Sequence, residues 1–239
     1  MNNGIQLIPF LNLALAFIPA IVVVIIFLKW SLDFRESLHA ITRMLAQLLL
    51  VGYFLAFIFD SDSALIVLGV LTVMVFASSW IALRTIKLER KNLFFKAFFA
   101  IFLGGSLTLL LVSQGVLNLN PWYSPRYLIP LAGMIFSQAM NSVSLAAERM
   151  RAESGRGLDY EKARGIALRA SLIPITNSLF AVGLVSLPGM MTGQILSGIS
   201  PLIAVRYQIM VMCMVYGASG MASALFLTLI KPRDKEIQT

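Results

Sequence analysis

Two amides and several thioethers stand within otherwise apolar runs, and these side chains are the best suited to hold a cation. Gln138 and Asn141 are three residues apart, and Met134 and Met140 flank them. Amide oxygens and thioether sulfurs both coordinate metal ions, and thioethers favour soft ions over Fe²⁺ or Mg²⁺. The same side chains also suit plain packing between helices, so the two interpretations stay open.

A second group of such residues lies in the stretch 170–205, which is 36 residues long and contains no charged side chain. Glycines and prolines punctuate it, and Met190 and Met191 directly follow Pro188-Gly189. As one straight helix it would measure about 54 Å, far more than a hydrocarbon core of about 30 Å. We therefore expect a discontinuous crossing that contains a hinge. The residues predicted to form the hinge or line a translocation path are Gly183, Ser186, Pro188, Gly189, Met190, Met191, Gly193, Met134, Gln138 and Asn141.

Motifs for enzymatic chemistry are absent from the sequence. It contains no phosphate-binding Gly-x-x-x-x-Gly-Lys-Ser/Thr loop, no His-Glu-x-x-His and no nucleophile elbow. None of the eleven Asp and Glu residues is expected within the hydrocarbon core, which weighs against a proton- or sodium-coupled carrier. We therefore predict a non-enzymatic chain that binds no cofactor of its own, and we assign no metal ligands.

The elements that must position these residues are membrane spans. Hydrophobic residues make up 59% of the chain and charged residues only 13%, a composition typical of integral membrane proteins. We predict an all-α, polytopic membrane protein that forms a single transmembrane domain over residues 1–239. The expected spans are 7–28, 44–59, 64–83, 97–117, 127–147, the discontinuous stretch and 207–230, about seven in all. An amphipathic surface helix over residues 35–47 is expected to precede the second span.

The positive charges predict the orientation of these spans. With seven crossings and the N-terminus outside, 17 of the 19 Lys and Arg residues fall on the inner side. Only Arg126 and Arg206 remain outside. A single crossing by the stretch 170–205 keeps the basic C-terminus on the cytoplasmic side. The net charge of +8 is therefore explained by positive residues that orient the spans and contact lipid headgroups in the cell (inner) membrane. We expect no nucleic-acid partner.

A strongly charged segment, residues 148–171, lies directly before the discontinuous stretch. Gly155 and Gly157 are expected to interrupt the chain, and Asp159 is a good N-cap for a helix from Tyr160 to about Ser171. This helix either rests on lipid headgroups or docks a soluble partner. The predicted docking residues are Gly157, Asp159, Ala163, Ile166, Ala167 and Ala170.

The central motif Gly183-Leu-Val-Ser-Leu-Pro-Gly-Met-Met-Thr-Gly193, with Ser200-Pro201 and Tyr207-Gln-Ile-Met-Val211, closely resembles the FetB-type permeases of bacterial iron-export ABC transporters. That family includes a plant branch linked to aluminium tolerance. The resemblance extends over nearly the whole chain. It departs at Arg156-Gly157-Leu158-Asp159, where family members carry a Leu-Gly-Ala-Thr-like turn.

The resemblance implies a permease subunit that exports iron or a related metal. Its ATPase would be a separate subunit that binds ATP and Mg²⁺, with two copies of each chain, so a permease homodimer is expected. The segment 148–171 would then be the coupling element. The alternatives are an ATP-independent channel or carrier, an ABC permease for a different small substrate, and a membrane scaffold that transports nothing. A requirement for ATP and for the ATPase partner distinguishes them.

Overall fold

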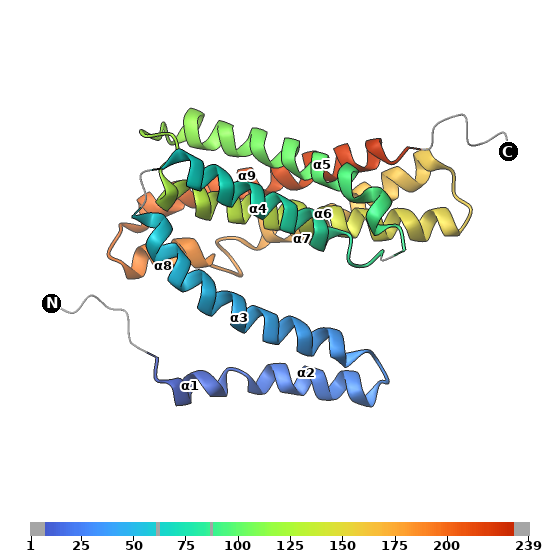
Figure 1. The fold of residues 1–239 in the computed structure, drawn as a ribbon, viewed down its shortest axis with the longest axis horizontal. Helices are drawn as coiled ribbons and strands as arrows, with labels where there is room; N and C mark the ends of the chain where they lie inside the picture. Colours follow the sequence, from blue (N-terminus) through green and yellow to red (C-terminus); the bar gives the residue numbers. More distant parts are fainter. Residues whose placement is uncertain (1–7, 61–62, 87, 232–239) are drawn as a thin grey trace. The chain divides into compact units, whose positions relative to one another are not determined.

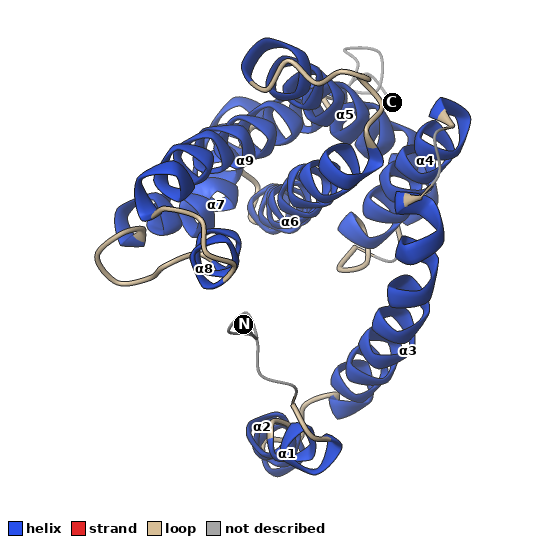
Figure 2. Cartoon of the chain, turned by 90° about the vertical axis from the view of Figure 1, so that its left-hand side faces the viewer, coloured by secondary structure: helices blue, strands red, loops and turns tan. Residues whose placement is uncertain are grey.

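The computed structural model describes residues 8–60, 63–86 and 88–231, and each named element in this part of the chain is a helix (Figures 1 and 2). The elements are α1 (Phe10–Leu15), α2 (Ile18–Lys29), α3 (Phe34–Phe59), α4 (Ala64–Ala82), α5 (Arg90–Leu110), the π-helix η1 (Leu111–Val116), α6 (Pro125–Gly155), α7 (Tyr160–Ala181), α8 (Gly189–Leu196) and α9 (Pro201–Leu229). Leu7, Lys87, Arg233 and Lys235, which entered the predicted spans and charge count, lie outside the described residues.

Six helical segments are long and apolar enough to cross a membrane. They are Phe10–Lys29, Phe34–Phe59, Ala64–Ala82, Arg90–Val116, Pro125–Gly155 and Pro201–Leu229. These segments confirm the prediction of an all-α, polytopic membrane protein. The remaining predicted crossing, the discontinuous one, is divided between the second half of α7 and α8.

The described chain separates into two compact units, the first of which comprises residues 8–60 with 196–198. Here α2 packs against α3, and the apolar side chains of both helices are exposed, as suits lipid contact. The first predicted span is interrupted between Leu15 and Ile18, just ahead of Pro19. The predicted surface helix at 35–47 is not a separate element, because α3 continues without a break to Phe59.

The second unit, whose described residues are 63–86, 88–195 and 199–231, is a helical bundle built around α6. Helix α6 packs against α4, α5, α7 and α9, as the view along the bundle shows (Figure 2). Phe136 of α6 and Phe226 of α9 are among the largest fully buried side chains. Helices α5 and α9 approach closely because Gly104 lies against Ala222, where a Cβ atom would come within 2.9 Å of the Ala222 nitrogen.

The bundle has two distinct ends (Figure 1). We call one the charged end, where the α4–α5 connection, the last turns of α6, the first turns of α7 and the last turn of α9 meet. The opposite end contains the start of α6 and the start of α9. Helices α7 and α8 together extend from the charged end to the opposite end, with one break between them.

Two helix boundaries differ from the sequence prediction. Helix α6 runs eight residues beyond Ala147, because the side chains of Arg149 and Glu153 form an ion pair (2.8 Å) one turn apart. Helix α7 does not end near Ser171 but continues through Pro174 to Ala181. The buried side chains of Ser171 and Ile175 on either side of the proline offset the hydrogen bond that Pro174 cannot donate. Because α7 ends at Ala181, the break predicted at Pro188-Gly189 begins at residue 182.

Candidate functional site

The break in the discontinuous stretch covers residues 182–188, which we call the hinge. Its first turn is closed by hydrogen bonds from Val185 N to Ala181 O (2.8 Å) and from Gly183 N to Ser186 O (3.0 Å). Gly183 has a φ of +84°, a left-handed conformation that favours glycine. Helix α8 restarts after Pro188, whose carbonyl oxygen accepts a hydrogen bond from the Thr192 hydroxyl (3.2 Å).

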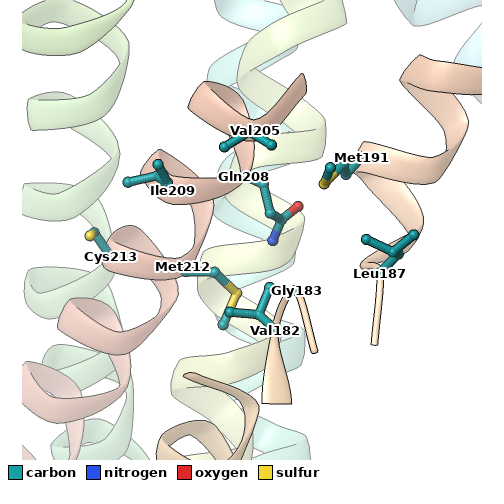
Figure 3. Close-up of a pocket in the computed structure, with 9 residues that line it drawn as sticks. All are labelled: Val182, Gly183, Leu187, Met191, Val205, Gln208, Ile209, Met212 and Cys213. Carbon is teal, nitrogen blue, oxygen red and sulfur yellow. The ribbon is translucent and has the colours of Figure 1, made fainter. Parts of the chain in front are cut away.

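A cavity of about 300 Å³ lies between the hinge, α8 and α9, and we call it the hinge cavity (Figure 3). It is lined by Val182, Gly183, Leu187, Met191, Val205, Gln208, Ile209, Met212 and Cys213. Gln208 is only 5% exposed, and its Oε1 atom has no hydrogen-bond partner among the described residues. Figure 3 shows the Gln208 amide on the side of α9 that faces Met191.

A second cavity of about 470 Å³ lies between α6, α8 and α9 toward the opposite end, and we call it the methionine cavity. Three methionines line it: Met134 of α6, Met190 of α8 and Met210 of α9. The Oε1 atom of Gln194, also in its wall, is buried without a partner in the described part of the chain. Two adjacent cavities thus combine thioethers with an amide oxygen that accepts no hydrogen bond.

The residues predicted to line a translocation path are only partly brought together. Met134 and Met190 meet in the methionine cavity, and Gly183 and Met191 line the hinge cavity. Gln138 and Asn141 line neither cavity; Gln138 is half-buried and Asn141 is exposed on α6. The other predicted path residues, Ser186, Pro188, Gly189 and Gly193, belong to the hinge and to α8 but not to a cavity wall.

The turn between α6 and α7 forms an exposed tip at the charged end, residues 156–159. Gly157 has a φ of +83°, and the Leu158 N–H donates to Glu153 O (3.2 Å). The Asp159 side chain caps α7 by accepting a hydrogen bond from Lys162 N (2.8 Å). This bond lowers the pKa of Asp159, because the carboxylate form is the one that accepts it. The predicted N-cap is confirmed.

A buried carboxylate fixes the base of this tip. The side chain of Glu153 is 5% exposed, and one of its oxygens lies 2.8 Å from Arg149 and 3.0 Å from Arg156. Both arginines remain partly exposed at 44% and 62%. Because the Glu153 carboxylate pairs with Arg149 of α6 and with Arg156 of the tip, it fixes the tip against the end of α6.

The two central alanines of the predicted docking face of α7 point into the bundle. Ala163 and Ala167 are fully buried, together with Ser171 and Ile175 on the same face, since α7 packs against α6 and α9. In this structure the two alanines cannot contact a partner. Gly157, Asp159 and Ile166 are exposed, and Ala170 is half-buried.

The first turn of α7 is tied to the last turn of α9. The hydroxyl of Tyr160 donates to the carbonyl oxygen of Leu227 (2.6 Å), and the Glu161 carboxylate lies 3.9 Å from Lys231 Nζ. Leu227 is among the last four residues of α9, whose carbonyl groups lack partners within the helix. The tip is therefore joined to the helix that walls both cavities.

Several residues of these cavities and of the tip were not predicted as site residues from the sequence. Gln208 had a detectable signal, an amide within an apolar run, and Met212 follows it at the helical spacing of four residues. Nothing in the sequence marks Tyr160 as the partner of Leu227. Among the described residues no group of three or more His, Cys, Asp or Glu side chains is placed to hold a metal ion.

Comparison with known proteins gives consistent matches. The model of the family described as "Uncharacterised protein family (UPF0014)" matches residues 10–158 and 159–233. A UPF0014 membrane protein of Synechocystis is 42% identical over 197 residues, which cover 75% of each chain. No solved structure matches.

Two further relatives carry functional names. The "Probable iron export permease protein FetB" of Escherichia coli is 34% identical over 236 residues, covering 91% of this chain and 89% of the relative. The protein "ALUMINUM SENSITIVE 3" of Arabidopsis thaliana is 33% identical over 228 residues, covering 86% and 82%. The predicted resemblance is confirmed by these matches.

Proposed function

This multi-pass membrane chain belongs to the UPF0014 family, and from that premise we propose that it is the permease subunit of an ABC transporter that exports iron or a related metal ion. The near full-length match to a relative named as a probable iron export permease supports the choice of cargo. ATP and Mg²⁺ would be bound by a separate ATPase subunit, and the assembly would contain two copies of each chain.

The observation that carries this proposal is the link between the tip and α9. Residues 156–159 form an exposed turn whose two flanking helices pack into the bundle, and Tyr160 joins α7 to Leu227 of α9. A force applied at the tip would thus reach the helix that lines both cavities. Such a connection suits a subunit that is driven from outside the membrane by another protein.

The distribution of charge supports the orientation of the proposed transporter. The charged end carries the basic residues in the last turns of α6 and the first turns of α7, whereas Arg126, at the start of α6, and Arg206, at the start of α9, belong to the opposite end. By the positive-inside rule the charged end would face the cytoplasm, where a soluble ATPase is found. The C-terminus would then be cytoplasmic and the N-terminus outside, in the cell (inner) membrane.

The hinge provides the moving part of the proposed mechanism. Residues 182–188 are not α-helical, and they separate α7 from α8. ATP-driven closure of the ATPase pair would push the tip, and α8 would change its angle to α9. The hinge and methionine cavities lie on the two sides of α8 that this motion would open and close.

Co-purification tests the partnership. The chain, produced together with a candidate ABC-type ATPase subunit that has no membrane spans of its own, is expected to co-purify with that subunit through the tip. Ile166→Glu places a charge on the exposed face of α7 and is expected to weaken the complex at least tenfold, whereas Leu107→Gln, an exposed change on α5 away from the tip, is not. A chain that binds no ATPase and still moves metal would instead be a channel or carrier.

A further inference from the structure

We propose that the hinge cavity is a binding site for a soft monovalent cation, held by the amide oxygen of Gln208 and the thioethers of Met191 and Met212. The inference rests on the proposed function only in assigning this site to a transport route. The binding chemistry itself follows from the residues that line the cavity.

The first observation is the unpartnered oxygen of Gln208. Its side chain is 5% exposed, its Oε1 atom accepts no hydrogen bond in the described part of the chain, and it lines the cavity. A buried acceptor without a partner is unfavourable, because it has lost water and gained nothing in exchange. A cation bound in the cavity would supply the missing partner.

The second observation is the sulfur in the same wall. Met212 lies four residues after Gln208 on α9, so the two side chains share one face of the helix. Met191 approaches from α8, and Figure 3 shows its sulfur on the side that faces Gln208. Cys213 lies at the margin and is exposed. One oxygen and two thioethers from two helices thus border a single cavity.

The chemistry of these ligands selects the cation. Thioethers bind soft ions such as Cu(I), and carboxylates and waters bind hard ions such as Al³⁺ or Mg²⁺. None of the nine described residues that line the cavity carries a charge. The cost of moving an ion out of water rises steeply with its charge, so an uncharged lining favours a monovalent ion. Cu(I), or Ag(I) as its redox-inert substitute, fits both conditions.

The site also lies where transport would require it. Val182 and Gly183 of the hinge form one wall, and Met191 of α8 forms another. A change in the angle between α7 and α8 would move Met191 relative to Gln208 on α9. The same hinge that opens the path would therefore assemble or disrupt the ligand set.

Cation binding by the purified full-length chain tests the proposal. In detergent micelles with a reductant, a competition titration with a Cu(I) chelator is expected to give about one tightly bound Cu(I) per chain. X-ray absorption is expected to show both sulfur and lighter ligands. Al³⁺ and Mg²⁺ are expected to compete only at more than a hundredfold higher concentration. The absence of Cu(I) binding would overturn the site.

Variants distinguish the site from other sulfur atoms. Met191→Leu and Gln208→Leu are each expected to weaken Cu(I) binding at least tenfold, whereas Met221→Leu, on the exposed surface of the same helix, is not. Gln208→Met, which substitutes a thioether for the amide, is expected to retain binding and thereby exclude a folding defect. If Cys213→Ser abolishes binding and Met191→Leu leaves it unchanged, the proposal is wrong.

The two proposals fail in different ways. Vesicles that contain the chain and its ATPase report ATP-dependent flux, and the micelle titration reports binding alone. Flux of iron that persists in Met191→Leu and Gln208→Leu, with no Cu(I) bound by the wild type, would overturn the site and leave the proposed function standing. Cu(I) binding without any ATP-dependent flux would overturn the proposed function and leave the site.

Discussion

The hydroxyl of Tyr160 donates a hydrogen bond to the main-chain carbonyl of Leu227 at 2.6 Å, across 67 residues of sequence. Tyr160 is the first residue of α7 after the exposed tip, and Leu227 lies in the last turn of α9. The guanidinium of Arg164 and the ammonium of Lys231 lie 5.5 and 5.9 Å from the Tyr160 ring. The ring therefore lies at the junction between the tip and the helix that lines both cavities.

Removing this hydroxyl tests the junction. Tyr160→Phe keeps the ring and deletes one hydrogen bond, a net loss of about 1 kcal/mol. We expect the bundle to stay folded but the ratio of metal transported to ATP hydrolysed to fall several-fold in reconstituted vesicles. Tyr53→Phe, whose side chain in α3 is 82% exposed, is the matched control and should leave this ratio unchanged. Equal ratios in wild type and Tyr160→Phe would exclude a coupling role.

A pair of substitutions on α7 tests which face meets the partner. Ala163→Glu would put a carboxylate into a fully buried position, which we expect to cost at least about 3 kcal/mol in folding and to lower the yield of folded chain. Ile166→Glu, on the exposed face, should leave the unfolding temperature within about 2 °C of wild type and weaken ATPase binding. The opposite pattern would restore the alanine face as the docking surface.

Much of the fold was predictable from the sequence, because apolar length and positive charge report directly on membrane spans. The ends of helices were less predictable. Pro174 usually signals a helix end, yet α7 continues because the buried Ser171 and Ile175 hold both sides of it in the bundle. The alanine face was found correctly as a face. The packing of α6 and α9 against this face was not predicted, because periodicity cannot say whether another helix or another protein covers it.

The cavities were the least predictable part. Gln138 and Asn141 are polar residues in a span, and so is Gln208, but of the three only Gln208 lines the hinge cavity. The difference depends on the break at residues 182–188, which moves α8 away from α9 and leaves room beside Gln208. A single sequence carries no information about that spacing between helices.

The close contact between α5 and α9 predicts that replacing Gly104 destabilises the bundle. At Gly104 an added methyl group would meet the backbone nitrogen of Ala222 at 2.9 Å, so the helices must separate. Gly104→Ala is expected to destabilise the bundle by about 1–3 kcal/mol in a thermal unfolding assay in detergent. Gly69→Ala is the control, because no atom lies within 4 Å of its added Cβ, and it should be neutral or stabilising. Equal unfolding temperatures for the two variants would contradict the close α5–α9 contact.

The capping carboxylate predicts a pH effect at the tip. Folding lowers the pKa of Asp159, so its contribution to stability is present above the unfolded pKa of about 4 and is lost as pH falls through the lower folded value. We expect the protection of the first-turn amides of α7 against hydrogen exchange, measured relative to their intrinsic exchange rates, to fall in that acidic range in wild type. Asp159→Asn keeps a good cap without a titrating group, and its exchange should show no such step. A step of equal size in both proteins would assign the effect to another group.

Metal flux across vesicles that contain this chain and the proposed ATPase subunit tests the central claim most directly. With the charged end facing the bulk solution, added ATP and Mg²⁺ should drive iron or a related metal into the vesicle lumen. Omission of the ATPase, or a hydrolysis-deficient ATPase, should abolish that flux. Metal movement at the same rate without ATP or without the partner would contradict the account and make the chain a passive channel or carrier.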